Sequence, residues 1–384
     1  MRRYLPVGIL AAIIIIIQLL TAVSGTSYYL TQLTMSAYYA LVAVGLCLLM
    51  GYAGQISIGQ AGFFAIGGYT AATITTQDLT PLLGRPFWGF LDRIGFLLSR
   101  PNPYGDDLVY LHPWISFLIA IAITLVVALA VGKPVLGLKG HYLAMATLGF
   151  GTIIYRIVLG TRLFGEADGI SNVPGFQLFP GVSISGNMSD RVGNYYLAWT
   201  AVVVGMLILV NVIHSRVGRS LRALHGNEEA ADAMGVNTAR LKLNVFVVGA
   251  LFASVAGIML THYNGGIGPS EASVSKSVRY VAIVAVGGMA NVWGTLTMSV
   301  VLNFLSLRGV FGSYDDAVFG FVLIAIILFA PEGFLKASLF EDINRRVKTW
   351  LHGRSFTRRR TAAVNPLKSD TEKESAATRA EKPE

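Results

Sequence analysis

The chain has 384 residues, of which 54% are hydrophobic and only 13% are charged. Soluble domains carry about 25% charged residues, so an ordinary cytosolic enzyme and a disordered protein are excluded, and a single cysteine excludes a disulfide-stapled secreted domain. The formal charge of +9 comes largely from basic residues in short loops and in the tail, which is typical of membrane orientation rather than of nucleic-acid binding. The composition predicts a polytopic integral membrane protein that contacts lipid and no nucleic acid.

The first apolar segment, Val7–Val23, contains no charged residue. A helix of this length spans roughly 26 Å, which is just enough for the hydrocarbon core. Arg2 and Arg3 before it, with a small-residue sequence ending at Ser24, also fit a signal peptide. Signal peptides usually have apolar regions of about 7 to 15 residues, so a retained membrane anchor is favoured.

Eight further apolar segments follow along the chain, with almost no charge in their middles. They are continuous rather than alternating, which favours helices over a β-barrel, because every backbone amide in lipid must be satisfied. The sequence therefore predicts an all-α membrane protein with about eight to ten transmembrane helices and at least one broken or re-entrant segment. The eight segments are Leu30–Met50, Ala61–Ile74, Trp114–Val131, Tyr142–Gly160, Tyr196–Ile213, Leu243–His262, Val281–Leu305 and Ala317–Ala330.

The positions of lysine and arginine near the span ends predict the orientation. Lys133 and Lys139 mark one cytoplasmic turn, and five basic residues mark a larger cytoplasmic loop from His214 to Lys242. With arginines at both ends of the apolar region, both termini are expected in the cytoplasm. The sequence divides into a membrane domain over residues 1–340 and a basic, largely disordered cytoplasmic tail over residues 341–384.

Two cytoplasmic termini require an even number of crossings, whereas the plain count is nine. We expect the missing crossing within Val281–Leu305, where Gly287, Gly288 and Gly294 interrupt the run. This region is predicted to form two short helices or a re-entrant pair. Lys276, on the predicted outer side, runs against the orientation rule.

A stretch rich in glycine and glutamine, Gly51–Phe64, lies between two apolar segments. One interpretation is an interfacial turn with small residues for close helix packing. The other is a broken helix that lines a cavity, because irregular backbone inside a membrane is tolerated only against protein or water. The sequence favours neither. The candidate path-lining residues on the second interpretation are Gly54, Gln55, Ser57, Gly59 and Gln60.

A second group of small and polar residues follows Lys139 and includes Thr147, Gly149 and Gly151. These residues fit either a partner helix or a pore, and helix packing is the better interpretation. Thr147 is retained as a candidate for the translocation path.

The large cytoplasmic loop begins with a basic segment that includes Arg219. Asn227 can cap a second short helix, since Glu228 and Glu229 suit the positive end of its dipole, and Gly235 can end it. Such a helix is either a docking element or part of a solvated loop.

The chain lacks the sequence motifs for ATP binding and for metal binding. There is no Gly-x-x-x-x-Gly-Lys-[Ser/Thr] loop for ATP, no His-Glu-x-x-His and no Cys-x-x-Cys. We therefore expect no catalytic residue, no metal and no cofactor. No carboxylate lies in the middle of a span, which argues against a proton-driven carrier.

Four ordered blocks resemble the permease subunits of ABC importers for branched-chain amino acids, of the second, M-type kind. The blocks are GYAGQISIGQAGFFAIGGYTAA, GHYLAMATLGFG, SRVGRSLRALHGNEEAADAMG and APEGF, and the resemblance runs from about Leu30 to Phe334. Glu229, Ala230 and Ala231, followed by Gly235, are similar to the loop of ABC permeases that forms a coupling helix in a groove of the ATPase. The resemblance therefore assigns Arg219, Glu228, Glu229, Ala230, Ala231 and Gly235 to an ATPase-coupling loop.

The resemblance implies a subunit of an ATP-driven importer in the inner membrane. Its partners would be a second permease subunit, two cytoplasmic ABC ATPase subunits and a periplasmic amino-acid-binding protein, and its substrate a branched-chain or other hydrophobic amino acid. Related permeases for urea and short amides share much of the pattern. A stand-alone secondary transporter or channel is a further alternative. The chain departs from the family pattern at Ala167–Gly169, where the family often has Thr-Asn-Gly, and at Lys276 and Arg279, where apolar residues are expected.

Overall fold

Helices account for most of the described chain. The computed structural model describes residues 4–82, 93, 95–100, 108–179 and 182–329. The predicted tail over residues 341–384, its boundary at 340 and the APEGF block lie outside these residues. Within them, six helices are long and apolar enough to cross a membrane. They are α1 (Leu5–Val23), α2 with its terminal π turn η1 (Tyr29–Cys47 and Leu48–Tyr52), α5 (Pro113–Val135), α6 (His141–Gly160), α7 (Arg191–His214) and α10 (Thr238–Asn264).

Four shorter helices complete the bundle, and the prediction of an all-α polytopic membrane protein is confirmed. They are α3 (Gln60–Thr76), α11 (Val274–Gly287), α12 (Val292–Leu307) and α13 (Asp315–Phe329). The first helix, α1, packs against α7, where the Tyr195 hydroxyl donates to the Ile14 carbonyl at 3.1 Å.

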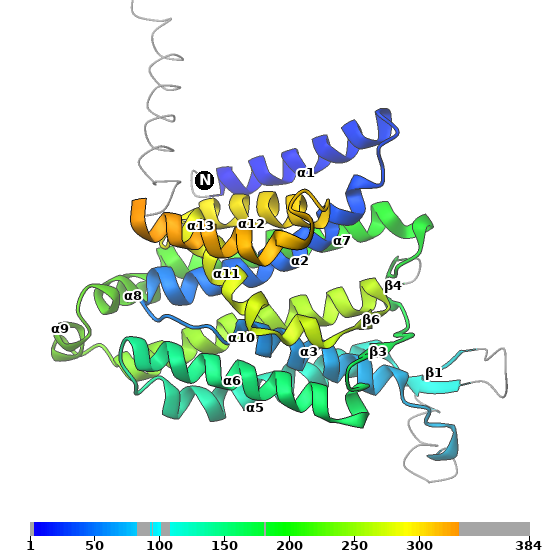
Figure 1. The fold of residues 1–384 in the computed structure, drawn as a ribbon, viewed down its shortest axis with the longest axis horizontal. Helices are drawn as coiled ribbons and strands as arrows, with labels where there is room; N and C mark the ends of the chain where they lie inside the picture. Colours follow the sequence, from blue (N-terminus) through cyan, green and yellow to red (C-terminus); the bar gives the residue numbers. More distant parts are fainter. Residues whose placement is uncertain (1–3, 83–92, 94, 101–107, 180–181, 330–384) are drawn as a thin grey trace, which may run out of the picture. The chain divides into compact units, whose positions relative to one another are not determined.

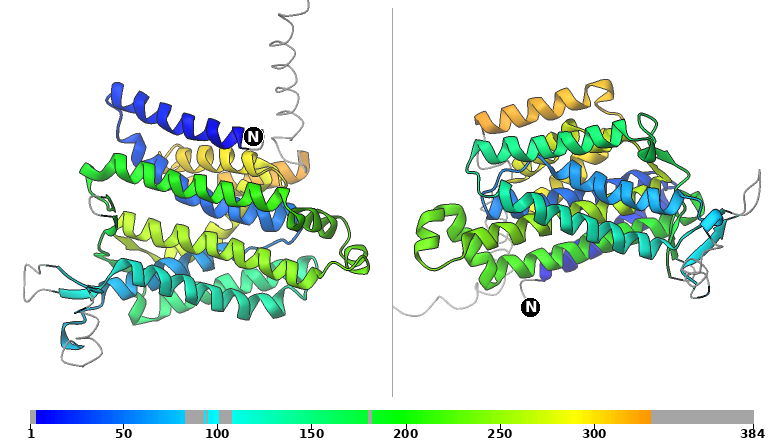
Figure 2. Two further views of the ribbon diagram at one scale, coloured as in Figure 1. Left: turned by 180° about the vertical axis from the view of Figure 1, so that it is seen from behind. Right: turned by 90° about the horizontal axis from the view of Figure 1, so that it is seen from below.

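The described helices run side by side between two ends that differ in structure (Figure 1). At one end lie α8 (Arg216–Gly226) and α9 (Glu228–Ala233), here called the α8–α9 end. Short strands lie at the opposite, hairpin end, and both views in Figure 2 show the same separation. The antiparallel strand pairs are β1 (Leu97–Arg100) with β2 (Leu108–Leu111), β3 (Ile170–Ser171) with β6 (Gly266–Ile267), and β4 (Phe176–Phe179) with β5 (Val182–Ile184).

Glycines hold α3 and α10 in close contact at the centre of the bundle. A Cβ atom on Gly257 of α10 would overlap the Phe64 carbonyl of α3, and one on Gly67 would lie 2.5 Å from the Ser254 carbonyl. Small residues allow two helix backbones to approach in this way. The contact fixes the position of α3, whose first residue is Gln60.

The crossing expected within Val281–Leu305 is two helices, α11 and α12, joined by a tight turn. Gly288 adopts a left-handed φ of +94° in this turn. The turn lies against the end of α2, because a Cβ on Gly51 would overlap the Met289 carbonyl, which also accepts a bond from the Cys47 thiol at 3.4 Å. The described bundle helices thus number ten, an even count.

Candidate functional site

The glycine-rich stretch after α2 is a break between two helices. The last turn of α2 widens into the π turn η1, residues 53–59 are irregular, and α3 begins at Gln60. Gly54 adopts a φ of +67°, which a residue with a side chain would rarely adopt. Both sequence interpretations describe part of this break, because one portion faces a cavity and another is buried between helices.

Neighbouring helices satisfy the backbone of the break. The Ile58 amide donates to the Thr147 hydroxyl at 3.0 Å, and the Ala61 amide donates to the Ser277 hydroxyl at 3.2 Å. Thr147 in turn donates to the Ala144 carbonyl at 3.0 Å. The Thr147 hydroxyl therefore positions the backbone of the break.

The packing interpretation of the small residues on α6 is confirmed for one of the two glycines. A Cβ on Gly59 would lie 2.9 Å from the Thr147 carbonyl, and one on Gly151 would lie 3.6 Å from the Ile58 carbonyl. Gly149, by contrast, has open space around its position.

Two buried polar side chains of the break have no hydrogen-bond partner among the described residues. Gln60 is 1% exposed and both its amide nitrogen and its oxygen are unpaired, and the same holds for the hydroxyl of Ser57. The Gln60 amide faces α10, with its nitrogen 3.3 Å from an ideal Cβ on Gly249. Buried polar groups are rarely left unsatisfied, so these two are candidates for contact with a polar ligand.

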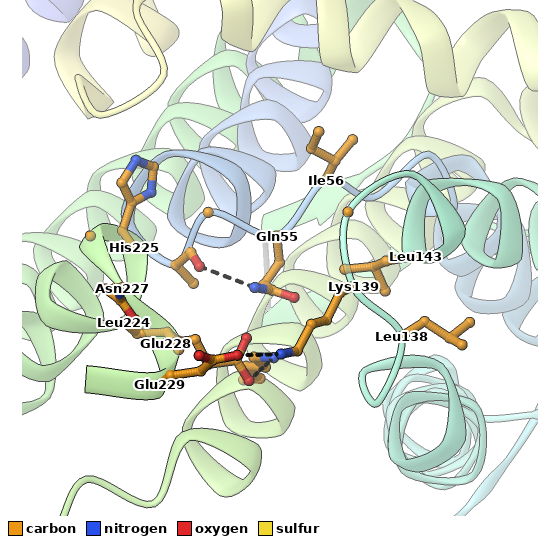
Figure 3. Close-up of a pocket in the computed structure, with 15 residues that line it drawn as sticks. Gln55, Ile56, Leu138, Lys139, Leu143, Leu224, His225, Asn227, Glu228 and Glu229 are labelled. Atoms are coloured by element: carbon orange, nitrogen blue, oxygen red, sulfur yellow. Dashed lines mark hydrogen bonds and ion pairs between the residues drawn. The ribbon is translucent and has the colours of Figure 1, made fainter. Parts of the chain in front are cut away.

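The other portion of the break lines a cavity of about 480 Å³ at the α8–α9 end (Figure 3). Gly54 and Gln55 form one wall, and the Gln55 amide donates to the Ala53 carbonyl at 3.3 Å. The turn between α5 and α6 forms a second wall, and residues 224–229 form a third. The cavity therefore joins the break to the loop that holds α8 and α9.

Two ion pairs tie α9 to the walls of this cavity. Glu229 binds Lys139 at 3.1 Å, and this hydrogen bond raises the pKa of Lys139. Glu228 binds Lys242, whose side chain is buried. The loop also touches the break directly, because a Cβ on Gly54 would lie 2.9 Å from His225 Nδ1. A side chain at position 54 would push His225 away.

The helix predicted from the capping pattern is confirmed as α9. The Asn227 side chain accepts from the Ala230 amide at 3.0 Å, and Gly235 follows the helix with a φ of +82°. Of the residues assigned to the coupling loop, Ala231 is buried and Glu228 is half-buried. The exposed ones are Arg219, Glu229, Ala230 and Gly235.

Sequence reasoning missed three residues that complete this site. It interpreted Lys139 and Lys242 as markers of orientation and left out His225. The opposite charges of Glu228 and Lys242 were a usable signal, but they lie 14 residues apart and α10 had to be placed before they could be paired. Within the described ranges, no three His, Cys, Asp or Glu side chains come together as a metal site would need.

The helical bundle and the broken helix define a multi-pass membrane protein, and comparison with known proteins gives its family. Residues 28–329 match the family described as branched-chain amino acid transport system / permease component, so the chain belongs to this family. No solved structure matches the chain.

Similar proteins include two kinds of permease. The high-affinity branched-chain amino acid transport system permease protein LivM of Salmonella typhimurium is 29% identical, over 79% of this chain and 68% of the relative. LivH of Escherichia coli is 27% identical, over 80% and 96%. BraD of Pseudomonas aeruginosa is 25% identical, again over 80% and 96%. Escherichia coli also contains a LivM that is similar to this chain, so one organism holds both kinds.

Proposed function

We propose that this chain is a permease subunit through which a branched-chain amino acid crosses the inner membrane. In this proposal a second permease subunit completes the path, two cytoplasmic ATPase subunits supply the energy, and a periplasmic binding protein delivers the substrate. The permease forms no covalent bond with its substrate. It opens to one side or the other, and nucleotide binding to the partner subunits shifts the balance between the two states.

The observation that carries the proposal is the contact between the α8–α9 loop and the break. Glu229 and His225 come from this loop, and Lys139 and Gly54 lie on the opposite walls of the same cavity. A partner that moves α9 would therefore move groups that touch the irregular backbone. Coupling needs such a physical connection between the energy source and the moving element.

The exposed face of the loop suits the docking of the ATPase. Arg219, Glu229, Ala230 and Gly235 are exposed, whereas Leu221 and Leu224 of α8 are buried against the bundle. Docking on this face places the α8–α9 end in the cytoplasm. Both termini are then expected in the cytoplasm, because the described bundle helices are even in number.

The proposed path runs along the break. Gln55 lies at its cytoplasmic mouth, and Ser57 and Gln60 offer unpaired polar atoms deeper in the bundle. Gly54 and Gly59 let the backbone approach its neighbours, and Thr147 holds it in place. Polar atoms at a broken helix can contact a zwitterion that would otherwise be costly to bury.

The substitution Glu229→Lys tests the docking surface. It replaces the Lys139 ion pair with a repulsion and reverses the charge that an ATPase groove would meet, so we expect the ATPase subunits to be lost on purification of the permease and ATP-dependent leucine uptake to fall. Glu166→Lys is the matched control, because Glu166 also forms an exposed ion pair, with Arg162 at 3.7 Å, but lies toward the hairpin end. Full ATPase yield and full uptake with Glu229→Lys would contradict the assignment.

A further inference from the structure

Three polar side chains meet where α2, α11 and the short turn η5 (Pro269–Ala272) come together. Lys276 donates to Glu271 Oε1 at 2.9 Å and to the Tyr39 hydroxyl at 3.2 Å, and that hydroxyl donates to Glu271 Oε1 at 3.0 Å. The Lys276 ammonium also lies 4.5 Å from the centre of the Tyr39 ring. The three hydrogen bonds link these side chains into a closed triangle. Within it, Glu271 and Lys276 form an ion pair.

This triangle lies well along α2 rather than at its first turn, and its two charged side chains are half-buried. Tyr39 is ten residues along α2, or about 15 Å from the beginning of the helix. Ser277, the residue after Lys276, accepts the Ala61 amide at the beginning of α3. The charges are therefore placed beside the end of the break, where two helices begin within the bundle, and ionisable groups at such depth mark substrate pathways.

Aromatic rings surround the pair on the side of α3 and α11. Tyr39 stacks with Phe64 at a centroid distance of 6.2 Å and lies 6.4 Å from Tyr280, and each of these three rings is 5% exposed or less. The surroundings thus combine the charges of Glu271 and Lys276 with an apolar wall, and Arg279, whose charge is compensated by Asp315 and Asp316, lies one helical turn away.

The polar groups here are not saturated. Glu271 Oε2 and the hydroxyls of Tyr69 and Tyr280 are buried and have no hydrogen-bond partner among the residues that the structure describes. The side chains of Glu271 and Lys276 keep 18% and 21% of their surface exposed, so the ion pair is not fully enclosed by the bundle. Spare acceptors and donors beside a partly exposed ion pair are what an incoming polar headgroup needs.

A second ion pair, one helical turn further along α11, already anchors this helix. Arg279 binds Asp316 at 2.8 Å and Asp315 at 3.5 Å, and so ties α11 to α13. It also donates to Ser306 of α12.

We propose that Glu271 and Lys276 hold the headgroup of the transported amino acid, an inference that rests on the proposed function. The substrate ammonium replaces Lys276 at the Glu271 carboxylate, and the substrate carboxylate binds the released Lys276 ammonium. A zwitterion brings one charge of each sign, so both residues stay paired when their mutual bond opens. A ligand with a single charge would leave one of them unpaired, which is costly inside a protein. The branched side chain of the substrate packs against Tyr39, Phe64 and Tyr280.

The test uses the complete transporter in proteoliposomes, with the binding protein and ATP. Glu271→Gln and Lys276→Met each leave one charge without its partner, and we expect leucine uptake to fall roughly 30-fold or more. The double variant Glu271→Gln/Lys276→Met removes both charges, which a purely structural pair tolerates, and it is expected to stay as inactive as the single variants. Asp316→Asn is the matched control at the second ion pair of α11, where Asp315 still pairs with Arg279, and its uptake should equal wild type.

A photoactivatable leucine analogue provides a readout that a structural role would not change. During turnover we expect it to label the peptides that contain Tyr39 or Phe64, and to lose this labelling in Lys276→Met while the complex still assembles. Lys276→Arg keeps the charge and should keep the labelling, which tests the assignment even if the Met variant does not fold. Wild-type uptake by the double variant, or labelling that is the same in all variants, would overturn the headgroup assignment alone. A wild-type complex that hydrolyses ATP without any leucine uptake would instead overturn the proposed function and the inference with it.

Discussion

Thr147 shows how one hydroxyl can support an irregular backbone. It accepts a hydrogen bond from the Ile58 amide of the break and donates one to the Ala144 carbonyl of its own helix. The hydroxyl thus acts both as acceptor and as donor. Inside a membrane no water is available to accept a hydrogen bond from an unpaired backbone amide. Residue by residue, the break is therefore held in place by groups on α6 and α11 as well as by its own local hydrogen bonds.

We expect Thr147→Val to lower the stability of the protein by about 1–3 kcal/mol, because it leaves the buried Ile58 amide without an acceptor. Thr152→Val is the control on the same helix, since the Thr152 hydroxyl donates only to the Leu148 carbonyl of α6. The stability of both variants is measured by thermal unfolding in detergent. Equal melting temperatures for the two variants would show that the Ile58 amide finds another partner.

Gln60→Leu separates function from stability at the other end of the break. The Gln60 amide is buried without a partner among the described residues, so an apolar replacement of similar size should leave thermal stability unchanged or raise it. If the amide contacts the passing substrate, ATP-dependent leucine uptake falls. Gln55→Leu, at the cavity wall, is expected to have a smaller effect. Normal uptake by both variants would remove these residues from the path.

At the scale of elements, the close contact of α3 with α10 depends on the absence of side chains. Gly257 faces the Phe64 carbonyl so closely that even a methyl group has no room. Because α3 begins at Gln60, any shift of α3 would also move the end of the break. The packing of this helix pair therefore sets the geometry of the candidate path.

Gly257→Ala should destabilise the protein by about 1–3 kcal/mol through overpacking. Gly149→Ala is the matched control on α6, where a Cβ meets open space. It should be neutral or slightly stabilising, because alanine is more favourable than glycine inside a helix by about 1 kcal/mol. Melting temperatures of the two variants, measured side by side, check the difference. A loss of stability in both would point to backbone flexibility instead of helix contact.

The elements differ in how far the sequence could predict them. The apolar run Trp114–Val131 predicted α5 to within four residues at each end, and the pattern from Asn227 to Gly235 predicted α9 with its cap. Local signals were sufficient in both cases. The separation of α11 from α12 was expected, but α11 begins at Val274, seven residues before the predicted segment, because Glu271 and Asp316 compensate the charges of Lys276 and Arg279.

The candidate site was predictable only in part, for the same physical reason. The break and the coupling loop were visible as unusual compositions, since each is local in sequence. The contacts between them were not, because His225 meets Gly54 across about 170 residues of chain and only the packing of the bundle brings them together. The short strands at the hairpin end were also missed, since two to four residues carry little pattern.

At the scale of the whole molecule, the orientation can be tested with the natural cysteine left in place. Cys47 is the only cysteine of the chain and is buried, so an impermeant maleimide should not reach it. We expect Glu229→Cys in the α8–α9 end to be labelled only after the inner membrane is permeabilised. Met188→Cys, whose native side chain is 83% exposed near the hairpin end, should be labelled from the periplasm. The reverse pattern would place α9 where no ATPase can reach it.

The turn between α11 and α12 has a consequence for how the protein is made. These helices have 14 and 16 residues, so they reach only about 21 and 24 Å, less than the roughly 30 Å of a bilayer core. Neither can settle in lipid by itself while the ribosome is still extending the chain. The turn between them packs against Gly51 at the end of α2, which was synthesised more than 200 residues earlier. We therefore expect α11 and α12 to become stable in the membrane only after the N-terminal third of the chain has been inserted.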